Sequence, residues 1–482
     1  MTNPTIYWHD YEAGGINPRA DRPMQFAGVR TDRELNIIGK PLEIYCRLSP
    51  DYLPHPEACL ITGITPQAAN QRGLPECEFA RRIHQEFSQH QTTVVGYNNI
   101  RYDDEMTRFL FYRNFIDPYA YSWENDNSRW DLLTLVRATY ALRPEGIEWP
   151  TNEEGNVSLK LDQLAPANGI EHTNAHDAMA DVHASIELAK KIMHAQPKLY
   201  NYSFDIRRKK KLIDLVESAL LNQSMLVYVS GFFGAESRYV QWVFPIAFHP
   251  ENQNQLIAWR LDANPEFWRD KSAAEINAQL FASREELQGE RPGLITITLN
   301  QCPFLAPEKT LAEAQAQNAG IDIAAVETNR ALLANDSTLR DHLLAAILDK
   351  DDRLVANEDP ERADADLALY SGGFFSAQAK THMNMIQQAS PEQLAGIELP
   401  LDDPRLPVLL FRFRARNFPH TLSASEAERW KQHCQNRLVH GGEAFLSSDE
   451  FVLKLEQLAE QHQQDPRKMA ILKSLADYLM TL

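Results

Sequence analysis

Hydrophobic and polar positions change their spacing along the chain, and each spacing predicts a different kind of element. In the first 195 residues, short apolar runs typical of strands alternate with segments whose apolar residues recur every three or four positions, as in helices. Strands are predicted at 6–10, 25–31, 43–47 and 93–97, and helices at 79–89, 104–114, 129–142 and 175–195. Short links join the first three strands, which predicts an antiparallel meander within an α/β domain.

The pattern changes after a basic run at 207–211, which is followed by a helical segment to about Leu221. Strands are predicted at 225–230, 239–248, 255–260 and 293–300, and a helix at 331–348. A charged, proline-containing stretch at 349–361 is typical of a linker. Beyond it, helices are predicted at 378–388, 426–438, 450–461 and 467–481. The chain therefore predicts three domains: an α/β domain at 1–196, a β-rich domain at 197–352 and a helical domain at 353–482.

Composition narrows the class of protein. The 482 residues have a mean hydropathy of −0.43 and no apolar run of membrane-spanning length, so we expect no membrane contact. The five cysteines are widely spaced without a CxxC pair, which argues against a disulfide framework or zinc site and favours the reducing cytoplasm. The formal charge of −18 means that any contact with nucleic acid must be local, and it should weaken with salt.

Two acidic residues end the first predicted strand. Asp10 and Glu12 are two positions apart, so in a strand both carboxylates point to the same face. Close like charges repel, and burial adds a desolvation cost. A divalent cation would relieve both, and oxygen ligands suit Mg²⁺ or Mn²⁺. Two solvated acids are the commoner meaning of such a short pattern, so this segment alone leaves both interpretations open.

Three later residues carry the same chemistry. Asp103 follows a predicted strand at the start of a helix, and His176 and Asp181 lie five residues apart at the start of the 175–195 helix. Each has an ordinary structural explanation when taken singly, because an acid in the first turn of a helix stabilises the helix dipole. Competing acids stand beside them: Asp104, Glu105 and Asp177.

In chain order, the motifs Asp10-x-Glu12, Asn99-x-x-Tyr102-Asp103 and His176-x4-Asp181 resemble those of the DEDD exonuclease superfamily, in the subtype with His in its last motif. The spacings favour Asp103 over Asp104 and Asp181 over Asp177. Longer strings are similar to the bacterial exonuclease I family and extend over essentially the whole chain. These strings lie at 9–12, 22–27, 60–66, 96–105, 126–131, 175–181, 229–234 and 413–419.

The resemblance implies an α/β ribonuclease H-like exonuclease domain with a mixed sheet, an SH3-like domain and an all-helical C-terminal domain that together enclose a DNA strand. It implies hydrolysis of single-stranded DNA from the 3′ end to nucleoside 5′-monophosphates, in DNA repair and recombination. The expected partners are single-stranded DNA and the C-terminal tail of single-strand-binding protein, and the expected protein is a monomer. Such a tail would need a basic rim around an apolar pocket, which the sequence cannot locate.

For the chemistry, the resemblance implies two Mg²⁺ ions, for which Mn²⁺ can substitute. Two ions about 3.5–4 Å apart stabilise both the attacking and the leaving oxygen of a phosphodiester. The expected ligands are Asp10, Glu12, Asp103 and Asp181, with Asp10 bridging both ions and Glu12 also close to the terminal nucleotide. His176 is expected to be the general base, because a neutral imidazole at pH 7 can accept the proton of the attacking water.

Single strands are bound by stacking on aromatic side chains and by basic contacts to phosphates. The stretch 101–143 contains both kinds of residue, and from it we expect strand contacts by Arg108, Tyr119, Trp123 and Arg137. The motif strings add Asn99, and in the resembling family the loop with Leu60, Thr62 and Gly63 meets the terminal nucleotide.

Two further basic positions are expected to bind the strand. Arg412, Arg414 and Arg416 alternate, which would align them on one face of an extended segment, and we expect DNA contact by Arg414 and Arg416. Lys160 stands where the family pattern leads us to expect arginine. Because lysine gives a point charge without the bidentate fork, a phosphate contact would survive this change but a planar contact would not.

Two other functions are compatible with parts of the pattern. An exoribonuclease of the same superfamily would share the site, but the RNA-trimming members are little longer than the nuclease domain. A strand-binding protein with an inactive nuclease domain is disfavoured because all four carboxylates and the histidine are present.

Overall fold

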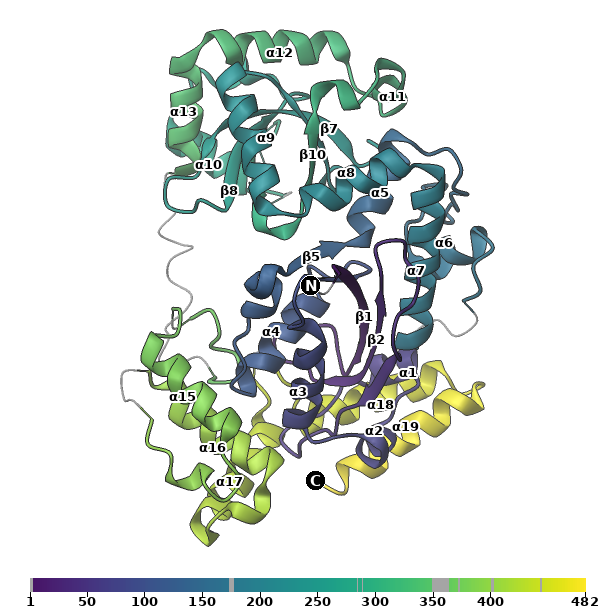
Figure 1. Cartoon of the computed structure of the whole chain (residues 1–482), viewed down its shortest axis with the longest axis vertical. Helices are drawn as coiled ribbons and strands as arrows, with labels where there is room; N and C mark the ends of the chain where they lie inside the picture. The colour runs from purple at the N-terminus through teal and green to yellow at the C-terminus, as the bar shows by residue number, and fades with distance from the viewer. Residues whose placement is uncertain are drawn as a thin grey trace. The chain divides into compact units, whose positions relative to one another are not determined.

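The computed structural model describes residues 3–172, 177–283, 285–287, 289–348, 364–371, 373–399, 403–442 and 444–482 (Figure 1). Their contacts divide the chain into two compact units. The first unit contains residues 1–129, 172–186 and 358–482, and the second contains residues 130–171 and 187–357. The chain therefore leaves each unit and returns to it, and the two units are described separately below.

The first sheet has the order β3-β2-β1-β4-β5. Its strands are β1 Thr5–Ala13, β2 Pro23–Thr31, β3 Leu42–Tyr45, β4 Thr92–Gly96 and β5 Ser128–Asp131. Strands β1, β2 and β3 are antiparallel neighbours, which confirms the predicted meander, and β4 runs parallel to β1, which makes the sheet mixed. The predicted helix 129–142 is wrong at its start, because residues 129–131 are in β5. The carboxylate of Asp131 caps helix α5 by accepting a hydrogen bond from the amide of Leu133.

Side chains of β1 alternate between the two faces of this sheet. Tyr7 and Tyr11 belong to a buried core with Phe26 and with residues of helices α3 (Glu76–Phe87) and α4 (Asp103–Arg113), which cover that face (Figure 1). Asp10 and Glu12 have the opposite parity, so they lie on the other face. The alternation of the strand thus separates its apolar core from its acids.

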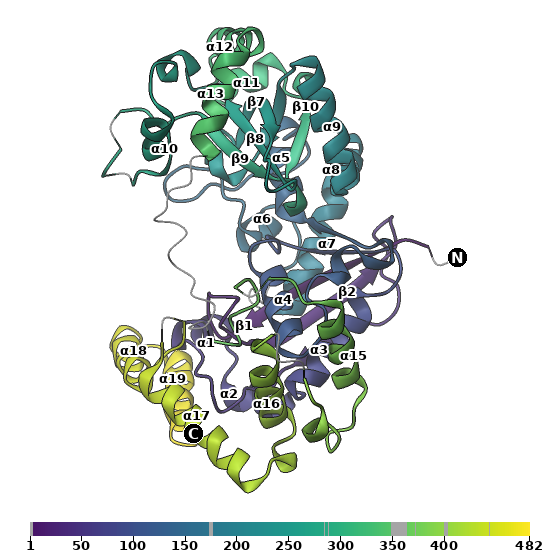
Figure 2. The same ribbon diagram turned by 90° about the vertical axis from the view of Figure 1, so that its left-hand side faces the viewer.

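The remaining helices of the first unit include a bundle from the C-terminal segment, as predicted. They are α1 Pro56–Thr62, α2 Pro66–Arg72, the first turns of α7 Ala178–Ala195, α15 Ala377–Gln388, α16 Arg405–Asn417, α17 Ala424–His440, α18 Ser448–Gln461 and α19 Pro466–Leu479. Helices α18 and α19 pack on α1 through a core that includes Cys59, Phe451 and Leu475 (Figure 2). This apolar packing unites the C-terminal helices with the N-terminal sheet in one compact unit.

The second unit is built on an antiparallel sheet of order β10-β6-β7-β8-β9, which confirms its β-rich character. Its strands are β6 Leu226–Val229, β7 Val240–Phe248, β8 Gln255–Arg260, β9 Leu294–Thr298 and β10 Phe304–Pro307. Its helices are α5 Leu132–Leu142, α6 Leu161–Ala167, the end of α7, α8 Pro197–Ile206, α9 Lys209–Asn222, α10 Ala273–Phe281, α11 Glu313–Asn318, α12 Ile323–Asn335 and α13 Ser337–Leu348. The predicted helix 331–348 is two helices, which meet at Asp336, and the predicted linker 349–361 lies outside the described residues.

Short 3₁₀ turns complete the structure: Ala120–Ser122, Glu124–Asp126, Gly231–Phe233, Pro265–Trp268, Leu299–Gln301, Glu308–Thr310, Leu394–Gly396 and Pro419–Thr421. Among the described residues, no helix has both the length and the apolar character needed to cross a bilayer.

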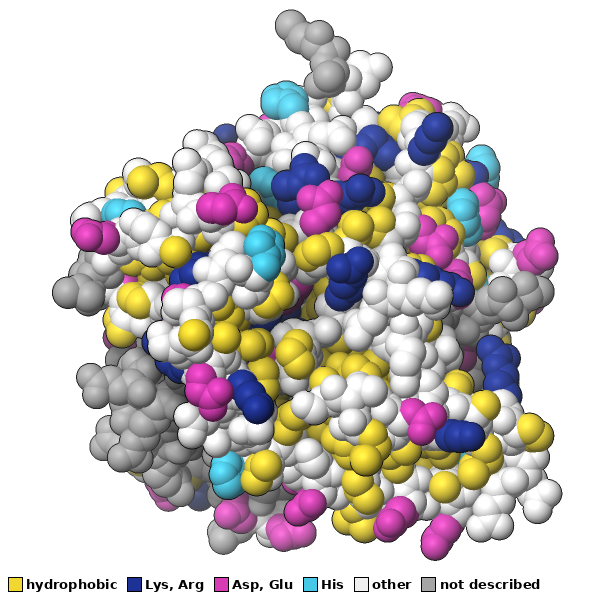
Figure 3. Space-filling model, turned by 90° about the horizontal axis from the view of Figure 1, so that it is seen from below, with side chains coloured by type: hydrophobic (Ala, Val, Ile, Leu, Met, Phe, Trp, Pro, Cys, Tyr) yellow, Lys and Arg dark blue, Asp and Glu magenta, His cyan; other side chains and the backbone are white. Residues whose placement is uncertain are grey.

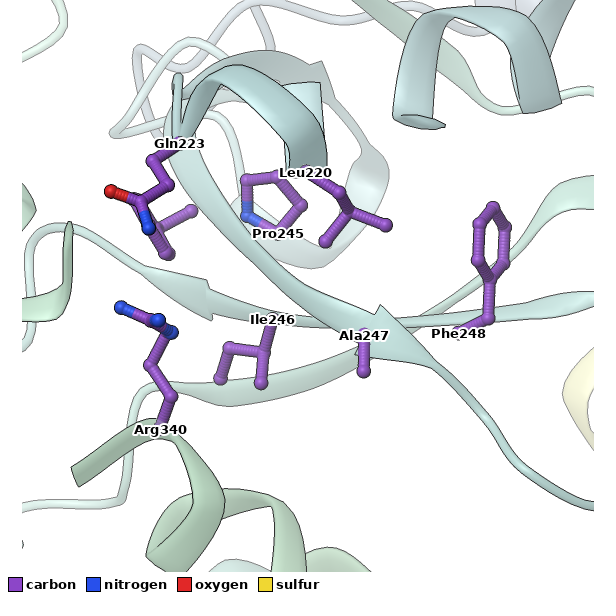
Figure 4. Close-up of a pocket in the computed structure, with 8 residues that line it drawn as sticks. Leu220, Gln223, Pro245, Ile246, Ala247, Phe248 and Arg340 are labelled. Atoms are coloured by element: carbon purple, nitrogen blue, oxygen red, sulfur yellow. The ribbon is translucent and has the colours of Figure 1, made fainter. Parts of the chain in front are cut away.

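A cavity of about 380 Å³ opens in the second unit beside β7 (Figure 4). Leu220 and Gln223 of α9 line it together with residues 244–248 and Arg340 of α13. The guanidinium of Arg340 donates hydrogen bonds to the carbonyls of Leu333 and Ala334 at the end of α12. No acid lines the cavity and its cation is already engaged by backbone, so this cavity is not a metal centre.

The arginines at 412, 414 and 416 lie on helix α16, so the predicted extended segment is wrong. Arg414 is buried and donates to Glu426 at 2.6 Å. The guanidinium of Arg416 is buried between Asp51, at 2.7 Å, and Asp366. Neither side chain is exposed in this structure, so its burial gives no support to the expected strand contacts of Arg414 and Arg416, which stay predictions.

Arg416 instead belongs to a buried ion cluster that links the C-terminal helices to the loop before α1. Arg437 of α17 donates to Asp51 at 2.8 Å and to Asp366 at 3.2 Å. Burial would raise the pKa of both carboxyls, but Arg416 and its neighbouring arginines hold each pKa well below its usual range. The cluster therefore stabilises the unit as long as both acids are ionised.

Removing Arg416 should destabilise this unit severely. Arg416→Met leaves Asp51 and Asp366 short of a buried partner, and we expect a loss of about 3–5 kcal/mol in the free energy of unfolding, measured by urea titration. Because the pKa of each acid is lowered in the folded state, this stabilisation is present above the ordinary carboxyl pKa and is lost in acid. The difference from the parent should therefore shrink as the pH falls below about 4.

The matched control is Arg81→Met on α3. Arg81 is half-exposed and pairs with Glu78, and an exposed pair contributes only about 0–1 kcal/mol. Equal losses in the two variants would show that burial of the cluster contributes nothing.

Candidate active site

Strand β1 and helix α7 bring three of the predicted metal ligands together. Asp10 and Glu12 lie on one face of β1, and Asp181 lies in the first turn of α7. One carboxylate oxygen from each residue lies within 4.8 Å of the other two. Oxygen atoms at this spacing can share a divalent cation.

Asp103, the first residue of α4, lies within electrostatic reach of this group. Burial is the largest cause that raises the pKa of Asp10 well above its usual range, and the nearby charges of Asp103, Glu12 and Asp181 raise it further. The pKa of Glu12 is raised to about 8, mainly by burial and then by the charges of Asp181 and Asp103. The neighbouring acids thus raise the proton affinity of Asp10 and of Glu12, and a cation between them would relieve the repulsion.

The neighbouring acids have other partners. Asp104 is fully buried, paired with Arg129, and accepts a hydrogen bond from the Asn99 amide at 3.1 Å. Asp177 accepts from the amide of Ala180 at 3.1 Å and so caps α7. Glu105 is paired with Arg108 at 2.6 Å. Each of these three acids thus has a structural partner, and Asp177 also contributes to the raised pKa of Asp10 and of Glu12. The choice of Asp103 and Asp181 as ligands stays a prediction.

Asn99 itself is completely buried and its amide points to Asp104. Its predicted contact with the substrate stays a prediction. Within the fold, the asparagine holds the start of α4, because the amide of Asp104 also donates to the Asn99 carbonyl at 2.9 Å. Through this bond Asn99 helps to set the position of Asp103.

Two histidines concern this site: His176, which was predicted but lies outside the described residues, and His172, which was not predicted but contacts Asp181. His176 falls in the segment 173–176, which the structure does not describe. His172 is described, and its Nε2 lies 2.5 Å from Oδ1 of Asp181. No motif includes His172, and the nine residues that separate it from Asp181 correspond to no regular spacing, so the sequence offered no signal for it.

Several expected strand contacts lie on the surface of the first unit. Trp123 is 63% exposed. The guanidinium of Arg108 lies 5.5 Å from the centre of the Tyr119 ring, which leaves a cation and an aromatic face together. Helix α1 ends at Thr62, whose hydroxyl accepts from the amide of Ile64 at 3.1 Å.

Leu60 is half-buried on α1, and Gly63 closes that helix with a φ of 70°, a conformation that favours glycine. The other two contacts, Arg137 and Lys160, belong to the second unit. Lys160 is exposed at the start of α6, and the Arg137 guanidinium lies against Gly231.

Charges are mixed on the face of the molecule shown in Figure 3. Lys and Arg side chains alternate there with Asp and Glu, and neither sign dominates. The described residues on that face therefore form no broad basic field, in keeping with the acidic composition.

Comparison with known families divides the chain into three consecutive matches. A model described as Exonuclease matches residues 7–189, one described as Exonuclease I SH3-like domain matches 207–347, and one described as Exonuclease I C-terminal domain matches 363–482. These matches confirm the predicted fold class: an exonuclease domain with a mixed sheet, an SH3-like domain and a helical C-terminal domain.

Curated relatives match along nearly the whole chain. Exodeoxyribonuclease I of Haemophilus influenzae is 45% identical over 477 residues, which cover 98% of each chain. Exodeoxyribonuclease I of Escherichia coli is 42% identical over 475 residues, which cover 98% of this chain and 97% of the relative.

Solved structures agree with these matches. Escherichia coli exonuclease I in complex with a dA16 oligonucleotide aligns with a TM-score of 0.93 at 41% identity, covering 99% of this chain and 100% of that chain. Its zinc-bound complex with single-stranded DNA aligns with a TM-score of 0.91 at 41% identity, covering 99% of both chains. A structure of the ExoI/SSB-Ct complex aligns with a TM-score of 0.89 at 40% identity, also covering 99% of both chains.

The raised pKa of Glu12 predicts that cation binding releases protons. With a pKa of about 8, Glu12 is largely protonated at pH 7 in the metal-free protein, and the cation must displace that proton. Binding of Mn²⁺ to the DNA-free protein should therefore tighten as the pH rises from about 6 to about 9. Calorimetric titrations in buffers with different heats of ionisation count the released protons.

In the control, Glu12→Gln, proton release should fall because this position no longer titrates. An affinity independent of pH over this range would contradict the assignment of these acids as a cation site.

Proposed function

Since this chain belongs to the exodeoxyribonuclease I family, we propose that it hydrolyses single-stranded DNA stepwise from the 3′ end and releases nucleoside 5′-monophosphates. The observation that carries the proposal is the acidic cluster at the end of β1, where Asp10, Glu12 and Asp181 share one small volume. The domain matches before and after this site extend the likeness over the full chain.

We propose that Asp10, Glu12, Asp103 and Asp181 hold two divalent cations, Mg²⁺ with Mn²⁺ able to substitute. The donor set fits hard cations, because every ligand is a carboxylate oxygen. Bound cations would supply positive charge that stabilises the attacking and leaving oxygens of the phosphodiester. Asp10 is the candidate bridging ligand, because its pKa responds to all three other acids. Glu12 would hold one ion beside the terminal nucleotide.

His176 is our proposed general base. In the sequence it directly precedes Asp177, the residue that caps α7, and Asp181 is a residue of that helix. The motif His176-x4-Asp181 supports this role.

For the strand, we propose contacts with the side chains of Trp123, Arg108 and Tyr119 in the first unit. Trp123 is the exposed stacking surface, and the cation beside the Tyr119 ring suits a base and its phosphate. Leu60, Thr62 and Gly63 are proposed to meet the terminal nucleotide. Arg137 and Lys160 are proposed phosphate contacts of the second unit, where Lys160 supplies a point charge.

We also propose that the chain binds the C-terminal tail of single-strand-binding protein, because the ExoI/SSB-Ct complex involves a protein of this family. We propose that it acts as a monomer in DNA repair and recombination. A cytoplasmic location agrees with its five cysteines, all of which are free thiols.

End-labelled substrates test the function directly. With 5′-labelled single-stranded DNA, we expect a descending ladder of shortened products, because removal begins at the 3′ end. With 3′-labelled DNA, we expect immediate release of labelled 5′-mononucleotide. RNA of the same sequence should remain intact, and EDTA should stop the reaction until Mg²⁺ is added in excess.

Asp10→Asn is the matched control for the labelled substrates, because it removes a ligand charge with little change in volume. It should hydrolyse nothing while still binding the strand. Cleavage of RNA at the rate of DNA would favour an exoribonuclease, and normal turnover by Asp10→Asn would exclude the metal assignment.

Substitution of His176 tests the general base. His176→Ala should lower the rate of hydrolysis about 10²–10⁴-fold at saturating Mg²⁺, the usual contribution of a general base. Strand affinity measured by fluorescence anisotropy in Ca²⁺ should not change. His183→Ala is the matched control, because His183 is exposed on α7 and is not a proposed site residue. A rate equal to that of this control would reduce His176 to a structural role.

A further inference from the structure

We propose that His172 is a positioning residue of the active site, which orients the carboxylate of Asp181 for cation binding. This inference rests on the proposed function, because it assumes that Asp181 is a metal ligand. It assigns the histidine a role in holding a ligand, which differs from the proton transfer proposed for His176.

The geometry defines the direction of the hydrogen bond. Nε2 of His172 lies 2.5 Å from Oδ1 of Asp181, and the imidazole side chain is only 2% exposed. A carboxylate oxygen accepts, so Nε2 carries the hydrogen and donates it. Within the described residues, the other ring nitrogen, Nδ1, is buried without a hydrogen-bond partner. Among the described residues, the hydrogen bond to Asp181 and burial thus hold the ring.

Asp181 needs such support because of the acids that it faces. Its oxygen lies within 4.8 Å of oxygens from Asp10 and Glu12, and repulsion among them favours rotation of its side chain away from the cluster. The Asp181 side chain is 19% exposed, so water offers an alternative partner in that direction. A donor at Oδ1 opposes this rotation and keeps the carboxylate turned toward the other acids.

The chemistry of imidazole suits this position better than a permanent cation would. Arginine carries a fixed positive charge, as Arg129 does beside buried Asp104. Such a charge beside a metal ligand would compete with the metal for the carboxylate. An imidazole N–H donates a hydrogen bond without a permanent positive charge. Partners of this kind orient metal ligands, and their removal typically weakens metal binding about 10–100-fold.

The test uses amide substitutions that place the donor at different distances along the side chain. The amide nitrogen of glutamine reaches about as far as Nε2, whereas that of asparagine reaches only as far as Nδ1. In the full-length, DNA-free protein, His172→Asn and His172→Ala should weaken Mn²⁺ binding about 10–100-fold, measured by calorimetry or by electron paramagnetic resonance. His172→Gln should recover most of the affinity.

Kinetics supply an independent readout. In the Asn and Ala variants, the Mn²⁺ concentration for half-maximal hydrolysis should rise by a similar factor. The rate at saturating Mn²⁺ should fall much less than in His176→Ala, because the proposed base is still present. A loss confined to the saturated rate, with unchanged Mn²⁺ affinity, would overturn the positioning role.

Two controls separate failure of this inference from failure of the proposed function. Asp181→Asn should abolish high-affinity Mn²⁺ binding, and unchanged binding in that variant would overturn the metal site itself. Loss in Asp181→Asn together with full affinity in His172→Ala would overturn only the role of His172. Equal weakening in the Gln and Asn variants, with lowered melting temperatures in both, would also overturn it, because the histidine would then act through packing alone.

Discussion

Repulsion among carboxylates at the end of β1 is the constraint on which the active site depends. Burial alone would make these acids costly, and their proximity raises the pKa of Asp10 and Glu12 further. A fold that retains such a cluster needs a compensating cation or proton at the same place. One face of the sheet packs on α3 and α4, and the opposite face of β1 presents both acids together. Stability of the core thus maintains an arrangement that would be unfavourable on its own.

The first unit contains a second set of buried acids with the opposite electrostatics. Asp51 and Asp366 are buried, yet Arg416 and Arg437 hold the pKa of each well below the usual range. Asp104 is paired with Arg129. The direction of the pKa shift differs between the two sets: the pKa is lowered for Asp51 and Asp366, which are partners of arginine, and raised for Asp10 and Glu12, which are proposed ligands. Burial alone does not distinguish them.

Much of this organisation was predictable because strand parity and motif spacing are local properties. The two-residue spacing of Asp10 and Glu12 along β1 correctly predicted that their side chains share a face. Asp104 pairs with Arg129, which lies in β5, and this residue was predicted to be in a helix. The sequence therefore did not indicate that Asp104 has a structural partner, and only the resemblance favoured Asp103 as the ligand. The conformation of the alternating arginines in 412–416 was ambiguous for a similar reason. In a helix, Arg412 and Arg416 lie one turn apart on the same face. Their acidic partners, Asp364 and Asp51, are distant in sequence, so no local pattern indicated them.

His172 illustrates why the outer part of a site is harder to predict than its ligands. A ligand must provide a particular atom to a cation, which restricts residue type and leaves a motif. A residue that orients a ligand needs only a donor within reach, and several side chains on different segments could provide it. Its choice depends on the path of the loop before α7 and on the rotamer of Asp181, and neither is encoded by local periodicity. A motif string alone does not separate a binding role from a structural one either. Arg414 and Arg416 lie in the string 413–419, and both are buried beside acidic partners that the sequence pattern did not indicate.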